Sequence, residues 1–157
     1  MKKTIPTLLL FLLLYPAITS GQITSSPSTE KLAFDSPGNY NDYIIDQWKK
    51  ARKAYKKVAE ALDEPIKSKT AYIAELKAAT KLIVEIKTLI ENVNEFKGND
   101  LNFKFNTLNL LKHYQNCFEK IYPEIVERLS KPNPDYTQLQ SKLDDTNAKG
   151  DNLTKLL

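Results

Sequence analysis

The spacing of apolar residues constrains this chain most strongly: it alternates between four and three positions in four separate segments. Such a spacing places apolar side chains along one side of an α-helix, where neighbouring helices can cover them. In the first segment the pattern consists of Ile44, Trp48, Ala51, Tyr55, Val58 and Leu62. The four predicted helices cover residues 41–62, 66–96, 101–129 and 135–157.

The connections between these segments are short and contain residues that end helices. Glu64–Pro65 ends the first segment, because the residue before a proline avoids the α region. Short connections make successive helices antiparallel, so the sequence predicts an all-α fold, an antiparallel up-down four-helix bundle. Pro123 lies inside the third segment, where it removes a backbone N–H and crowds the carbonyl of Glu119. We therefore expect the third helix to be kinked or broken near Pro123.

Two of the predicted helices have distinctive patterns. In the second, four further apolar residues should widen the main stripe on one side, which is typical of a helix that touches two neighbours. These residues are Ile73, Leu82, Leu89 and Phe96. In the fourth, Thr146 and Gly150 interrupt the apolar pattern, so we expect this helix to be the least stable.

The N-terminal residues have the layout of a secretory signal peptide. Lys2 and Lys3 precede an apolar run from Leu8 to Tyr15, and small residues stand before Gln22. We expect residues 1–21 to be the signal peptide, 22–40 a flexible Ser/Thr/Pro-rich leader, and 41–157 the bundle domain. The expected location is therefore the periplasm, the cell surface or the extracellular space. Cleavage before Gln22 would leave no transmembrane segment, whereas an uncut signal would serve as an anchor.

The sequence lacks the residues that most catalytic and cofactor sites require. His113 is the only histidine, so no histidine pair for a metal or haem is available, and no glycine-rich phosphate loop occurs. We expect no catalytic residue, no cofactor and no enzymatic activity. His113 and Cys117 lie four positions apart, but they would supply only half of a metal site. We place His113 far from the apolar stripe and Cys117 at its edge, where the thiol is either free or in an intermolecular disulfide.

The densest charge in the chain is a run of basic residues in the first predicted helix. Together they form an unbroken arc, termed here the cationic ridge: Lys49, Lys50, Arg52, Lys53, Lys56 and Lys57. Removing the signal peptide, which holds two lysines and no acid, lowers the formal net charge from +4 to +2. That balance argues against nucleic acid as a partner. We expect the ridge to bind an anionic envelope component or an acidic partner protein, and its alternative role is to keep the surface soluble.

Aromatic residues suggest a second function. They gather in the first and third predicted helices, where most should belong to the core and the remainder could line a pocket for a lipid or another small molecule. A carrier with such a pocket is the alternative to a binding module. An inhibitor of a secreted enzyme is a further alternative that no single residue favours.

One stretch carries a resemblance. Tyr40-Asn41-Asp42-Tyr43-Ile44-Ile45-Asp46-Gln47 leads into a basic helix after a signal peptide, and this layout resembles a group of small exported helical surface proteins from bacteria. The biochemical role of that group is uncharacterised. The resemblance implies export and a helical fold, and it assigns no role to any residue. We therefore expect a non-enzymatic exported binding module whose site is the cationic ridge.

Overall fold

The computed structural model describes residues 31–63, 68–96 and 102–157 of the chain. The elements are α1 (Pro37–Asp63), α2 (Lys69–Glu91), α3 (Phe103–Asn116), the π-helix η1 (Cys117–Ile121), α4 (Tyr122–Leu129) and α5 (Tyr136–Thr154). The expected signal peptide 1–21, leader residues 22–30 and the stop at Glu64–Pro65 lie outside the described residues.

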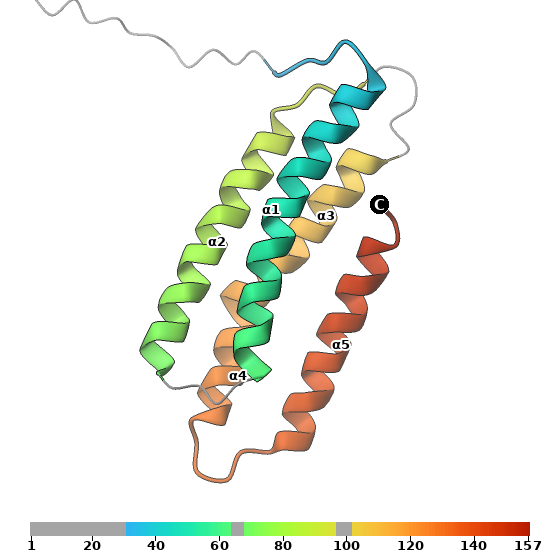
Figure 1. Ribbon diagram of the computed structural model, residues 1–157. Coiled ribbons are helices and arrows are strands. Elements are labelled where there is room, and N and C mark those ends of the chain that lie inside the picture. Colours follow the sequence, from blue (N-terminus) through green and yellow to red (C-terminus); the bar gives the residue numbers. More distant parts are fainter. Residues whose placement is uncertain (1–30, 64–67, 97–101) are drawn as a thin grey trace, which may run out of the picture. The chain divides into compact units, whose positions relative to one another are not determined.

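The helices form the predicted all-α, up-down-up-down bundle. Along the chain α1 descends, α2 ascends, α3 to α4 descends as one joined helix, and α5 ascends (Figure 1). The α3 helix packs against α1, α2 and α5. It therefore lies at the centre of the fold, and it is covered on several sides.

The break expected near Pro123 is present, and it takes the form of the π-helix η1. The N–H of Tyr122 donates to the carbonyl of Cys117, five residues earlier, instead of to the usual residue four earlier. Pro123 follows in the first turn of α4, where the missing N–H is tolerated. The π turn thus lets one long helix contain a proline and continue in the same general direction.

The first helix begins earlier than predicted, at Pro37 instead of about Asn41. Proline is favoured at the first position of a helix, and the Ser36 hydroxyl accepts a hydrogen bond from the N–H of Asn39 at 3.2 Å. Pro37 was expected to lie in the flexible leader, whereas it is the first residue of α1. Part of the expected leader, residues 37–40, therefore belongs to α1.

The C-terminal end of α2 is held by hydrogen bonds from two residues, Leu32 and Lys104. The N–H of Leu32 donates to the Asn92 carbonyl at 2.9 Å, and the N–H of Asn94 donates to the Leu32 carbonyl at 2.8 Å. The Lys104 ammonium, which is almost buried, donates to the Val93 carbonyl at 2.6 Å and to the Glu91 carbonyl at 3.3 Å. A cation at this position satisfies carbonyls that the end of a helix leaves unpaired.

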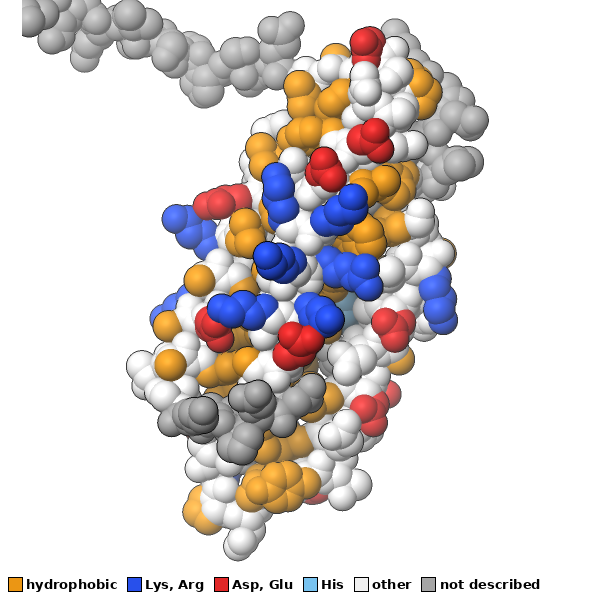
Figure 2. Space-filling model, viewed as in Figure 1, with side chains coloured by type: hydrophobic (Ala, Val, Ile, Leu, Met, Phe, Trp, Pro, Cys, Tyr) orange, Lys and Arg blue, Asp and Glu red, His pale blue; other side chains and the backbone are white. Residues whose placement is uncertain are grey.

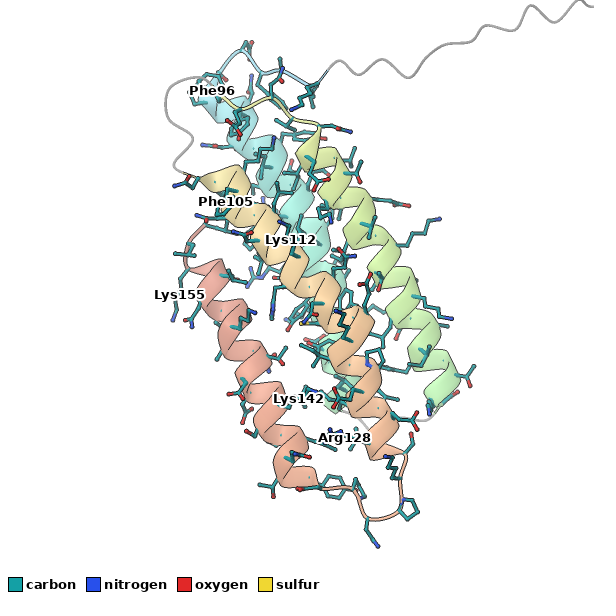
Figure 3. The ribbon with its side chains drawn as sticks, turned by 180° about the vertical axis from the view of Figure 1, so that it is seen from behind. Phe96, Phe105, Lys112, Arg128, Lys142 and Lys155 are labelled. Atoms are coloured by element: carbon teal, nitrogen blue, oxygen red, sulfur yellow. The ribbon has the colours of Figure 1, made fainter. Side chains whose placement is uncertain are left out.

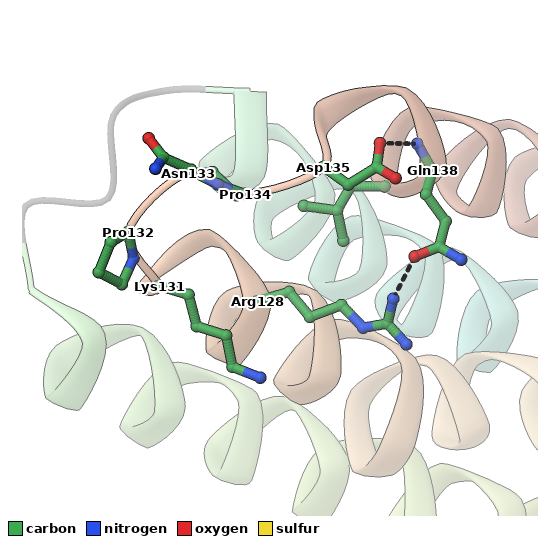
Figure 4. A pocket seen from close by; sticks show the side chains of 8 residues that line it. Arg128, Lys131, Pro132, Asn133, Pro134, Asp135 and Gln138 are labelled. Atoms are coloured by element: carbon green, nitrogen blue, oxygen red, sulfur yellow. Dashed lines mark hydrogen bonds between the residues drawn. The ribbon is translucent and has the colours of Figure 1, made fainter.

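The turn before α5 is held by polar side chains. Asp135 caps α5 by accepting the N–H of Gln138 at 3.0 Å, and the Gln138 side chain accepts a hydrogen bond from Arg128 of α4. These residues line a small pocket of about 280 Å³ at the turn (Figure 4). Seen from behind, Arg128 and Lys142 both lie in the region of α4 and α5, where Lys142 pairs with Glu124 (Figure 3). Their hydrogen bonds attach the start of α5 to α4.

Candidate functional site

All six residues of the cationic ridge lie on the solvent side of α1. Ile44, Ala51 and Val58 occupy the opposite side of the helix and are buried in the core, so the ridge side chains are all exposed. Figure 2 shows their basic groups gathered over the middle of α1, with acidic groups above and below. The structure therefore brings together every residue predicted for the binding site.

Three carboxylates neutralise part of this charge. Lys49 pairs with Asp46 at 3.6 Å, Lys56 pairs with Glu60 at 3.4 Å, and Lys57 pairs with Glu75 of α2. Exposed ion pairs of this kind are weak and are screened by salt, so a partner can displace them. The six ridge bases and their three paired acids together carry three net positive charges.

Two other ridge residues, Lys50 and Arg52, contact neutral groups. The Lys50 ammonium donates to the side-chain oxygen of Gln47 at 3.2 Å, and the Arg52 guanidinium lies 5.4 Å from the centre of the Trp48 ring. The second contact is a cation–π arrangement, which orients the guanidinium without neutralising it. From Lys49 to Lys57 the ridge extends about 12 Å along the helix, at 1.5 Å per residue. It is thus a short, positively charged surface on a packed helix.

His113 and Cys117 do not lie where the sequence analysis placed them. His113 is 5% exposed and Cys117 is 0% exposed, and the Cys117 sulfur lies 3.6 Å from Nε2 of His113. A single apolar stripe was assumed for this helix, but α5 covers a second side of α3. The burial of His113 follows from that second interface, since Gly150 of α5 lies against its ring.

Burial determines the chemistry of this pair. It raises the pKa of the Cys117 thiol to about 12, so the sulfur is neutral and poorly nucleophilic at neutral pH. A fully buried thiol also cannot meet the thiol of a second molecule in the folded state, so the structure contradicts the intermolecular disulfide. Among the residues that the structure describes, no group of three or more His, Cys, Asp and Glu could hold a metal ion.

His113 should make stability depend on pH. Burial, and next the positive charge of Lys149, lower its pKa below the ordinary 6.5, while a hydrogen bond to the backbone of Thr146 opposes the shift. The unfolded chain therefore binds more protons than the folded chain below pH 6.5. We expect stability to be complete above that pH and to fall as the pH drops below it.

Urea unfolding at several pH values between about 5 and 8 tests this expectation. Hydrogen bonds from Lys142 and Lys69 lower the pKa values of Glu124 and Glu127, so most of the stability that these two carboxylates contribute is lost below this range. In the His113→Gln variant the pH dependence should flatten. If the free energy of unfolding of that variant depends on pH as steeply as that of the unmodified protein, titratable groups other than His113 cause the dependence.

Aromatic rings fill the interface between α1 and α3, where a carrier pocket was expected. The Tyr55 ring stacks on Tyr114 with centroids 4.2 Å apart, and the Tyr122 hydroxyl donates to the Tyr55 hydroxyl at 2.9 Å. An apolar pocket of about 400 Å³ lies elsewhere, between α2 and the η1–α4 segment, with Phe118 and Pro123 in its wall. Its position beside the π turn was not predicted.

The structure also corrects the apolar surface of α2. Ile73 lines the pocket beside η1, but Leu82 and Leu89 are 36% and 46% exposed and lie on the other flank of the helix. The sequence spacing could have predicted this position, because both leucines follow Glu75 at intervals of seven residues and therefore share its side of the helix.

No described helix combines the length and the apolar character needed to cross a membrane. Comparison of the chain with protein-family models, with curated proteins and with solved structures found no match in any of the three.

Proposed function

We propose that this chain is an exported, non-enzymatic binding module that holds an anionic partner through the cationic ridge on α1. The observation that carries the proposal is the exposure of six basic side chains within nine consecutive residues of one helix. Because α1 is packed on its opposite side, the helix that carries these charges is already formed and needs no folding step before it binds. Export is supported by the signal-like residues 1–21.

Electrostatic attraction is the force that such a surface supplies. Contacts between exposed charges are individually weak and additive, and salt screens them over about 10 Å at moderate ionic strength. Binding through the ridge should therefore weaken steeply as salt is added. It should also depend on the number of basic residues more than on any single one.

The test is a variant that keeps the fold and removes the charge. Replacing Lys49, Lys50, Lys53 and Lys57 with glutamine should abolish most retention of the protein on the envelope fraction of its own cells and flatten the salt dependence of what remains. Retention is measured as the bound fraction over a series of sodium chloride concentrations, and circular dichroism verifies that the helices persist.

The control removes the same charge from other exposed positions. Lys112 and Lys155 appear in the view from behind, and Lys120 and Lys131 are also exposed (Figure 3). The fourfold glutamine variant at these positions has the same net charge as the ridge variant, and it should be retained like the unmodified protein. Equal loss in both variants would mean that net charge matters and that the ridge has no special role.

A further inference from the structure

The cationic ridge has an apolar border on α2. Lys57 of α1 pairs with Glu75 of α2, so the side of α2 that carries Glu75 adjoins the ridge. Leu82 and Leu89 follow Glu75 at intervals of seven residues, which is nearly two full turns, and therefore continue along that same side. Both leucines are exposed, at 36% and 46%.

The antiparallel arrangement sets which residues are neighbours. With Lys57 beside Glu75, moving seven residues back along α1 and seven forward along α2 places Lys50 beside Leu82. A second step of seven places Tyr43 beside Leu89. Along the junction of α1 and α2, Leu82 thus lies beside Lys50 of the cationic ridge, and Leu89 lies one further step away, beside Tyr43.

The acids around the ridge limit what can bind there. Asp46 and Glu60 bracket the basic residues along α1, and Glu85 is exposed on α2. A broad anionic sheet such as a lipid bilayer would meet these acids together with the lysines. A narrow partner that lies along the junction of the two helices would meet the lysines and leucines and leave Glu60 and Glu85 at its outer edges, while Asp46 and Glu75 are already paired with Lys49 and Lys57.

We propose that the junction of α1 and α2 is a docking surface for an acidic amphipathic helix of a partner protein. The inference rests on the proposed function and names the kind of partner. Leucines two turns apart match the apolar positions of a helix packed alongside, at i, i+3 or i+4, and i+7. Acidic side chains on the flank of that helix then reach Lys50, Lys53 and Lys57, so apolar contact and charge complementarity favour the same occupant.

The probe is a synthetic peptide of three heptads with leucine at positions a and d and glutamate at e and g. Its glutamates repel one another in a self-paired coiled coil, which keeps the free peptide available for binding. Affinity is measured by fluorescence anisotropy with the full folded chain. We expect binding that weakens with salt, and no binding of the matched peptide with lysine in place of glutamate.

Two variants separate this inference from the proposed function. Leu82→Ser with Leu89→Ser should weaken peptide binding about tenfold or more, since it removes the apolar anchors. The control pair is Val84→Ser with Leu156→Ser, two residues that are also exposed, and it should bind within about twofold of the unmodified protein. The fourfold ridge variant should bind weakly and with little salt dependence.

The outcomes are distinct. If the ridge variant loses binding and the leucine variant does not, the ridge binds anions and the docking inference is wrong. If the acidic peptide fails to bind while vesicles of phosphatidylglycerol and phosphatidylcholine do, the partner is a membrane surface, and the inference is again wrong. If the ridge variant binds peptide and vesicles as well as the unmodified protein does, the proposed function itself fails.

Discussion

Replacing Tyr122 with alanine should lower the free energy of unfolding by about 3–5 kcal/mol, the range for large aromatic residues removed from a core. Tyr122 is 0% exposed, lies next to Phe118 with ring centroids 6.1 Å apart, and donates its hydroxyl hydrogen to Tyr55. Tyr122 also follows the π turn directly, so the cavity that alanine leaves would lie where the backbone is already irregular. Urea unfolding followed by circular dichroism measures the change.

The phenylalanine variant at the same position separates packing from hydrogen bonding. Tyr122→Phe keeps the ring and removes one hydrogen bond, which should cost about 1 kcal/mol. The Tyr55 hydroxyl retains the side chain of Asn147 as a partner at 3.4 Å. If alanine and phenylalanine cost the same, the ring would contribute little, and the packing described around Tyr122 would be wrong.

The second large effect is expected at Gly150, where α5 lies close against His113 of α3. A Cβ atom placed on this glycine would lie 3.3 Å from Nε2 of His113, which leaves no room for a larger side chain. Gly150→Leu should therefore push α5 away from α3 and lower the free energy of unfolding by about 2–3 kcal/mol. Hydrogen exchange of the α5 amides shows whether the loss is confined to that helix.

A second substitution tests whether His113 is the obstacle. Combining Gly150→Leu with His113→Ala frees the space of the imidazole, so the double variant should be more stable than the sum of the two single changes implies. Gly150→Ala should be nearly neutral, because the gain in helix propensity, about 1 kcal/mol, offsets the tight contact. If the losses in free energy of unfolding caused by Gly150→Leu and His113→Ala simply add in the double variant, the leucine clashes with a residue other than His113.

The sequence was sufficient to predict the number, the order and the antiparallel arrangement of the helices. Those properties follow from apolar spacing and short connections, and both are local. The break near Pro123 was also predictable, because a proline lacks the N–H group that an uninterrupted helix requires. The sequence did not predict whether this break would be a π turn or a kink, because either one accommodates a residue without an N–H group.

The predictions that were wrong, for His113 and for the leucines of α2, depend on how the helices pack against one another. Whether His113 lies in water or against Gly150 depends on where α5 docks, and no property of α3 alone determines that. Leu82 and Leu89 present the opposite case, in which apolar side chains remain exposed because no described helix covers them. For the cationic ridge the sequence was sufficient, since uniform charge on one face of a helix predicts exposure without knowledge of its neighbours.

The burial of Cys117 has one more consequence. It is the only cysteine in the chain, and its thiol is enclosed at the centre of the bundle beside α5. A reagent in solution can reach the sulfur only during the moments when the helices around it separate. At reagent concentrations high enough that reaction outpaces reclosing, the rate of alkylation at this one atom therefore equals the rate at which the bundle opens, and no residue has to be substituted to measure it.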